Sequence, residues 1–248
     1  MNVAEKVKTA LLWIFVFLLP TQLGKHFFLP FSYINGVRID YIAPAIYLID
    51  IVLLFLSFFY FGTIKKHLKK HSKLFLLLTG LVIINVILAR VPQMAVYTVV
   101  RLFEIYIIYV IFACDNKKSL PLILSALLAG AGIQTLLASL QFVYGGSLQG
   151  PFYFLGERFF TLSTPNIATA SLDGNEFLRP YGTFSHPNSL GGFYVMLYAL
   201  SLGFLSQTKK TLSSMRLSFI VLASLSSFLV FFSFSKAAIG AFLLITVV

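Results

Sequence analysis

The side chains best suited to bind a phosphate gather in residues 179–192, which read RPYGTFSHPNSLGG. Arg179 offers a forked donor that matches phosphate oxygens, and His186 could act as a neutral base or, when charged, as a phosphate donor. Pro187 suits the first turn of a helix, whose candidate caps are Ser185, Asn188 and Ser189. Helix N-termini present free N–H groups and a partial positive charge. The spacing therefore predicts either a phosphate site or a well-capped helix beside an ordinary loop arginine.

The glycines of this segment would shape its backbone. Gly182 permits a sharp turn, and Gly191–Gly192 permits close approach of another backbone. We predict no metal site and no cofactor. His186 has no second ligand at helical spacing, and the i,i+4 pair His67 and His71 lies in a run of lysines that disfavours a cation.

Three ionisable residues interrupt apolar segments, where a charge is costly. Arg101 and Glu104 are spaced i,i+3, so they share a helix face and can pair. The pair could fix helix packing, or it could belong to a polar patch or a proton relay. Asp50 has no partner nearby in sequence, so it must find one on another helix or stay protonated. Asp50 is thus either a structural hydrogen-bonding group or a site residue.

Other polar side chains are given structural roles. The uncharged amides predicted to bond between helices are Asn85, Gln134 and Gln141. The carboxylates predicted to face solvent are Glu157, Asp173 and Glu176. The single cysteine, Cys114, is predicted to be a small buried apolar residue at a helix end.

The composition of the chain indicates what kind of secondary structure positions these residues. The chain has 248 residues, of which 58% are hydrophobic and only 11% are charged, with a mean hydropathy of +0.90. Soluble domains carry about 25% charged residues, so the deficit predicts an integral membrane protein. We expect an all-α fold, a polytopic transmembrane helix bundle.

Eight apolar segments are predicted to cross the membrane. Their approximate ranges are 9–23, 41–61, 74–89, 94–113, 121–143, 189–205, 217–234 and 237–248. The last is still apolar where the sequence stops and is too short to cross a ~30 Å core, so we expect a truncated helix. The polar, Gly-, Ser-, Thr- and Pro-rich stretch 144–187 is a long loop, a length typical of function or disorder.

The net charge of +11 reflects topology. Twelve of the nineteen basic residues fall in alternate loops: Lys6, Lys8, Lys65, Lys66, Lys69, Lys70, Lys73, Lys117, Lys118, Lys209, Lys210 and Arg216. This is the positive-inside pattern for a cytoplasmic N-terminus, and it places loop 144–187 outside. Such loops also suit anionic membrane lipids. We therefore expect membrane lipids, and no nucleic acid, as partners.

The stretch RPYGTFSHPNSLGGF resembles the O-antigen ligase and polymerase family of bacterial envelopes, similar to its Arg-x-x-Gly-Thr-Phe-x-His/Asn-Pro-Asn-x-Leu/Phe-Gly pattern. A weaker match is FSFSKAAIGAF, where Lys236 replaces the family's arginine, and GIQTLLASLQFVYG resembles its helix before the long loop. The resemblance covers roughly residues 120–248. It suggests a division into N-terminal helices, 1–118, and a ligase- or polymerase-like region, 119–248.

The resemblance implies a glycosyltransferase of the bacterial plasma (inner) membrane. Such enzymes transfer a glycan from an undecaprenyl pyrophosphate carrier to a lipid or glycan acceptor on the outer face. Arg179, Asn188 and Lys236 would then bind the donor pyrophosphate. His186 is only a weak catalytic candidate, because the family's general-base histidine lies in a later external loop. The alternatives are a secondary transporter or channel using Asp50, Arg101 and Glu104, and a non-enzymatic scaffold for envelope assembly.

Overall fold

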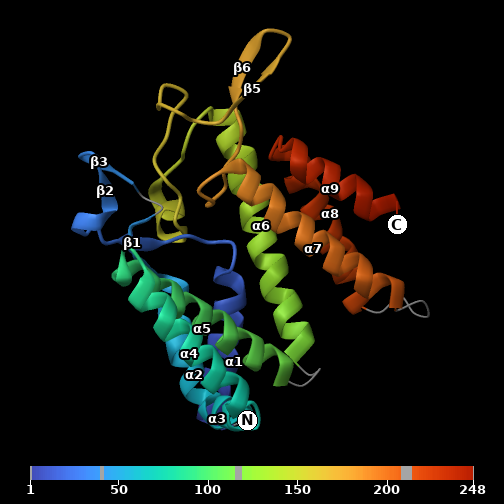
Figure 1. Ribbon diagram of the computed structural model, residues 1–248. Coiled ribbons are helices and arrows are strands. Elements are labelled where there is room, and N and C mark those ends of the chain that lie inside the picture. Colours follow the sequence, from blue (N-terminus) through green and yellow to red (C-terminus); the bar gives the residue numbers. More distant parts are fainter. Residues whose placement is uncertain (1, 40–41, 115–118, 208–213, 248) are drawn as a thin grey trace. The chain divides into compact units, whose positions relative to one another are not determined.

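The computed structural model describes residues 2–39, 42–114, 119–207 and 214–247, and most of them are helical (Figure 1). The chain divides into two compact units: Met1–Phe15 with Gly24–Ser119, and Val16–Leu23 with Leu120–Val248. The segment Val16–Leu23 joins the second unit because its polar backbone bonds there: the Pro20 carbonyl accepts a hydrogen bond from Gln134 Nε2 at 3.1 Å.

The first unit contains helices and two short antiparallel ribbons. Its helices are α1 (Val3–Leu18, up to Phe15), α2 (Leu48–Phe59), α3 (Phe61–Lys70), α4 (Ser72–Leu88) and α5 (Pro92–Cys114). Its ribbons pair β1 (Gly24–His26) with β4 (Ala45–Tyr47), and β2 (Tyr33–Ile34) with β3 (Val37–Arg38). A 3-10 turn, η1 (Pro30–Ser32), precedes β2. The turn between β2 and β3 is Asn35-Gly36, and both residues have positive φ, as tight hairpins require.

The second unit is a helical group with a long loop. Its elements are α6 (Leu120–Tyr144), η4 (Gly150–Leu155), β5 (Thr169–Leu172), β6 (Asn175–Leu178), α7 (Pro187–Gln207), α8 (Ser214–Phe232) and α9 (Lys236–Val247). α7 packs against α8 and α9, and α8 packs against α6. The side chains of Tyr194, Leu137, Phe219 and Leu229 are fully buried in this core. The β5–β6 hairpin turns at Asp173-Gly174, again with both φ angles positive, and extends from the end of the helices (Figure 1).

Within the described residues, four helices are long and apolar enough to cross a membrane: α5, α6, α7 and α8. Together α2 and α3 would make a fifth, but they are bent by 80°. The predicted all-α character is confirmed, whereas the eight spans and the orientation of the N-terminus stay predictions. The remaining apolar segments form shorter helices. α1 ends two residues before Pro20, as the backbone restriction before proline favours, and the predicted second span begins only at Leu48 because β4 precedes it. Lys117, Lys118, Lys209 and Lys210 lie outside the described residues.

Candidate functional site

Arg179 connects the starts of two helices in the second unit. It follows β6, and its backbone N–H donates to the Ala168 carbonyl at 3.1 Å. Its Nη2 donates to Asn188 Oδ1 at 2.7 Å, in the first turn of α7, and its Nε donates to the Ser233 carbonyl at 3.1 Å, just before α9. Burial lowers the pKa of Arg179 from its ordinary value, yet an arginine remains charged in proteins. The structure thus holds a partly buried cation between two helix N-termini.

Both helix N-termini are capped by side chains. His186 precedes α7, and its Nδ1 accepts a hydrogen bond from the Asn188 backbone N–H at 3.1 Å. Ser235 precedes α9, and its Oγ accepts from the Ala238 backbone N–H at 3.4 Å. The candidate caps for α7 named from the sequence were therefore wrong. The helix begins at Pro187, as expected, so the residue in the capping position is the histidine.

The capping bond decides the tautomer of the neutral His186 ring. A backbone N–H can only donate, so Nδ1 must be the unprotonated ring nitrogen and the neutral ring carries its proton on Nε2. Burial, and then the charge of Arg179, lowers the pKa of His186 from its ordinary value of 6.5. The neutral imidazole therefore offers an Nε2–H donor, and its one basic nitrogen is already bonded.

Lys236 is the first residue of α9 and is exposed, three residues after the carbonyl that Arg179 binds. α7 lies very close to this turn. A Cβ atom added at Gly191 would lie 2.6 Å from Ser233 Oγ and 2.8 Å from Ala238 Cβ. The close approach expected at Gly191 is therefore present, whereas Gly192 faces open space. The structure brings Arg179 and Asn188 into contact, and it gathers Lys236 at the same pair of helix starts.

Two glutamines of α6 hold the backbone of the motif. Gln141 Oε1 accepts hydrogen bonds from the Tyr181 and Gly182 N–H groups at 3.0 and 2.8 Å, and its Nε2 donates to the Gly182 carbonyl at 2.9 Å. Gln134 Oε1 accepts from the Thr183 N–H at 3.1 Å. Both amides are buried. Gln141 binds the loop, contrary to the prediction that it bonds to another helix, whereas Gln134 binds both the loop and the Pro20 carbonyl in the turn after α1.

Gly182 is the residue that lets this loop pass so close to α6. It has a φ of +58°, and an added Cβ would collide with Gln134 Oε1. The sharp turn expected at this glycine is therefore present. Any side chain at this position would displace Gln134, whose amide anchors Thr183. The hydrogen bond between Gln134 and Thr183 therefore requires a glycine at position 182.

Glu157 is buried, contrary to the prediction that it faces solvent. Only 3% of the residue is exposed. One carboxylate oxygen accepts from Gln141 Nε2 at 2.8 Å and from the Leu148 N–H at 2.9 Å, and the other accepts from the Gln149 N–H at 2.5 Å. Polar donors thus offset the cost of burying this charge. The other two loop carboxylates, Asp173 and Glu176, are exposed as predicted.

A second cluster lies in the first unit, where Arg101 of α5 contacts both Asp50 of α2 and Glu104. Arg101 Nη1 lies 2.8 Å from Asp50 Oδ1 and 2.7 Å from Glu104 Oε2. Its Nε donates to the Tyr97 hydroxyl at 2.9 Å, and its Nη2 donates to the Ala45 carbonyl. All three guanidinium nitrogens therefore have protein partners. Asp50 finds its partner on another helix, one of the two outcomes that the sequence left open.

Asp50 has a further role at the start of α2. Its Oδ2 accepts a hydrogen bond from the Tyr47 N–H at 2.7 Å, which ties β4 to the helix. The cluster carries two carboxylates against one guanidinium, so it has a formal charge of −1.

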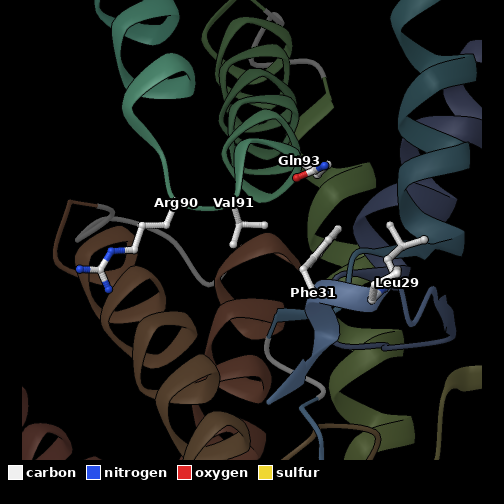
Figure 2. A pocket seen from close by; sticks show the side chains of 6 residues that line it. Leu29, Phe31, Arg90, Val91 and Gln93 are labelled. Carbon is white, nitrogen blue, oxygen red and sulfur yellow. The ribbon is translucent and has the colours of Figure 1, made fainter. Parts of the chain in front are cut away.

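The first unit also has a pocket of about 430 Å³. Its lining residues are Leu29, Pro30, Phe31, Arg90, Val91 and Gln93. Figure 2 shows the Arg90 side chain directed away from Phe31 and Leu29. The lining is mostly apolar and carries no acid, base or nucleophile, so it offers no catalytic group. Cys114 lies at the end of α5 and is exposed, contrary to the prediction of burial.

The described residues contain no group of three or more His, Cys, Asp or Glu side chains placed to hold a metal ion. Comparisons of the chain with protein-family models, with curated proteins and with solved structures each give no match. Function must therefore be inferred from the residues and their geometry.

Proposed function

We propose that the protein is a membrane glycosyltransferase, a ligase or polymerase, that transfers a glycan from an undecaprenyl pyrophosphate carrier to a lipid or glycan acceptor in envelope polysaccharide synthesis. The observation that carries the proposal is Arg179, held between the N-termini of α7 and α9 by Asn188 and the Ser233 carbonyl. These two bonds use two of the five N–H donors of a guanidinium. The remaining donors would bind pyrophosphate oxygens.

The reaction requires stabilisation of a leaving group. The acceptor hydroxyl attacks the anomeric carbon, the bond from that carbon to the pyrophosphate oxygen breaks, and negative charge builds on the pyrophosphate. Fixed cations and helix N–H groups in a partly dry site stabilise such charge. Arg179 and Lys236 would supply the cations, and Asn188 would orient the guanidinium. The acceptor hydroxyl would lose its proton to the departing pyrophosphate, directly or through water, because the basic Nδ1 of His186 is already bonded.

The local charge supports an anionic ligand. Arg158 adds a cation beside the motif, because its Nη1 donates to the Ser185 carbonyl at 3.3 Å. The buried loop carboxylate, Glu157, is committed to hydrogen bonds with Gln141 and loop N–H groups. The site therefore keeps a positive excess for a pyrophosphate.

The proposal includes a location. We place the protein in the bacterial plasma (inner) membrane as a multi-pass protein with eight spans, a cytoplasmic N-terminus and loop 144–187 on the external, periplasmic face. The basic residues in alternate loops support this orientation. A lipid-linked donor presented on that face would meet Arg179 directly.

A secondary transporter or channel is the second candidate, and the ionised cluster of Asp50, Arg101 and Glu104 favours it. A proton or ion relay needs groups that exchange partners. Arg101 instead has a partner on each of its nitrogens, including the Ala45 carbonyl, which favours a packing role.

Measurements on the protein reconstituted in vesicles distinguish the two functions. We expect it to bind undecaprenyl-pyrophosphate-linked glycan, with inorganic pyrophosphate as competitor, and to release undecaprenyl pyrophosphate when a glycan or lipid acceptor is added. Ion and proton flux are measured in the same vesicles. Flux that is lost in Asp50→Asn, together with no donor binding, would overturn the transferase and support the transporter.

A further inference from the structure

The basic helix α3 has one face made of lysines. The exposed lysines of this helix are Lys65, Lys66, Lys69 and Lys70. Their i, i+1, i+4 and i+5 spacing places them on one side of the helix. Lys73, also exposed, follows at the start of α4. The sequence contains no Asp or Glu between Asp50 and Glu104, so the lysines have no acidic neighbour along this part of the chain.

The direction of α3 differs sharply from that of the apolar helix before it. α2 and α3 are bent by 80° at Tyr60. When an apolar helix enters the membrane, a helix turned through that angle runs along the membrane surface. The exposed aromatic side chains of Phe58 and Phe61 flank the bend. Amphipathic helices that lie in the interface combine such apolar groups with lysines on the polar face.

The opposite face of α3 packs against other elements of the first unit. Ile64 is buried, and His67 Nδ1 lies 2.8 Å from the Tyr106 hydroxyl of α5. The His71 ring lies 4.7 Å from that of His67, centroid to centroid. At the bend, Lys8 Nζ lies 4.0 Å above the Tyr60 ring. The inner face is therefore fixed, and the lysine face is turned away from it.

Among the residues that the structure describes, no carboxylate forms a salt bridge with a lysine of α3. Like charges at i,i+4 repel within a helix, and Lys65–Lys69 and Lys66–Lys70 are two such pairs. The two nearest carboxylates in sequence, Asp50 and Glu104, are bound to Arg101. An external layer of anions would relieve this repulsion.

We propose that α3 is an interfacial helix whose lysine face binds the headgroups of anionic phospholipids. Each lysine near an anionic surface contributes about fivefold in affinity. The site is separate from Arg179 and independent of the transferase proposal.

The test uses the full chain purified in detergent and titrated with dioleoylphosphatidylglycerol or with dioleoylphosphatidylcholine, with bound lipid counted by native mass spectrometry. We expect the wild-type chain to prefer the anionic lipid. K66Q/K70Q should weaken anionic-lipid binding about 25-fold, while K66R/K70R should retain it. The matched control is K25Q/R90Q, which removes two exposed cations of the same unit outside α3.

Equal loss in K66Q/K70Q and K25Q/R90Q would overturn the proposal, because it would indicate a general charge effect. Equal binding of both lipids by the wild-type chain would overturn it as well. If the glutamine variant fails to fold, the lipid preference of the wild-type chain is measured at increasing salt concentration instead. The preference should fall as ionic strength rises from about 0.05 to about 0.5 M, and a preference unchanged by salt contradicts the proposal.

Discussion

At the residue scale, the geometry of Arg179 suits specific binding of a phosphate group, beyond the charge attraction that any cation would provide. A guanidinium can bind two phosphate oxygens at once, whereas an ammonium acts as a point charge. Arg179 is also oriented by Asn188 and by the Ser233 carbonyl. Its planar group is therefore fixed before a ligand arrives, and a lysine at this position would not be.

We expect Arg179→Ala to weaken transfer from the lipid-linked donor by about 10²–10³-fold. Arg179→Lys should retain a small part of the activity, because charge remains without the fork. The transfer activity of Lys236→Ala should lie between those of the wild type and Arg179→Ala, since this exposed cation lacks the oriented geometry of Arg179. The measurements are donor transfer and binding of undecaprenyl pyrophosphate, each beside detergent-extracted melting.

Arg90→Ala serves as the control, since it removes an exposed arginine from the other unit. A purely structural Arg179 would lower yield and melting temperature in proportion to activity. Full activity in Arg179→Ala at normal stability would remove this residue from the site.

His186 predicts that the stability of the protein depends on pH. Its pKa is lowered on folding, so the unfolded chain takes up the proton first as the pH falls. The stability that the neutral ring contributes is present above pH 6.5 and is lost as the pH falls below that value. Protonation also removes the Nδ1 acceptor that caps α7. We expect thermal stability to fall as the pH drops below about 6.5.

The contrasting variants are His186→Asn and His186→Ala. Asparagine keeps a capping acceptor without titrating, so this component of the pH dependence should vanish while stability at pH 7.5 is retained. Alanine removes the cap at every pH, so it should lose about 1 kcal/mol relative to the wild type above pH 6.5 and less below it, where the wild-type ring has lost its acceptor as well. An unchanged pH dependence in His186→Asn would show that the histidine does not set it.

At the scale of elements, loop 144–187 is positioned by α6. Gln141→Met keeps the side-chain volume but leaves the Tyr181 and Gly182 N–H groups without their acceptor and removes one of the three donors to Glu157. We expect a loss of about 2–5 kcal/mol, because buried unpaired groups cost about 1–3 kcal/mol each. Thermal unfolding and limited proteolysis of the loop measure this.

The matched control is Gln207→Met, at the exposed end of α7. It should leave both measurements unchanged. Loop cleavage that is no faster in Gln141→Met than in Gln207→Met would mean that the loop is held by other contacts.

The packing of α2 on α5 depends on three charges. Glu104→Gln leaves a neutral Asp50–Arg101 pair, so we expect a small effect. Arg101→Gln leaves two carboxylates without a cation and should cost about 1–3 kcal/mol or more. One interpretation left open by the sequence was a simple Arg101–Glu104 packing pair, for which the double substitution would restore membrane yield.

Because Asp50 is the third member, Arg101→Gln/Glu104→Gln should recover little, and adding Asp50→Asn should recover more. Membrane yield and melting of the single, double and triple variants give the comparison. Full recovery in the double variant would show that Asp50 is not energetically part of the cluster.

At the scale of the whole molecule, the orientation of the loops can be tested by labelling. In a Cys114→Ser background, which removes the exposed native thiol, Ser163→Cys and Ser171→Cys should react with an impermeant reagent in intact cells. Both positions are exposed. Ser72→Cys, beside the lysines of α3, should react only after the cells are opened. The reverse pattern would invert the topology and contradict the transferase proposal.

Several features of the molecule followed from local sequence. Composition and apolar runs gave the helices α5 to α8 to within two or three residues, because helix formation in a low-dielectric environment depends on the segment itself. Pro187 marked the start of α7. The turns Asn35-Gly36 and Asp173-Gly174 also carried a hairpin signal, which the apolar pattern of the spans obscured.

Only the tertiary structure decided how the polar residues are paired. Arg179 with Ser233, Gln141 with Tyr181, and Asp50 with Arg101 are each separated by 40 or more positions in the chain. Burial of Glu157 likewise required donors from α6 and from its own loop. A buried polar group takes whichever partner the packed helices bring within about 3 Å. Local sequence determines which segments become helices, but packing determines which polar groups meet.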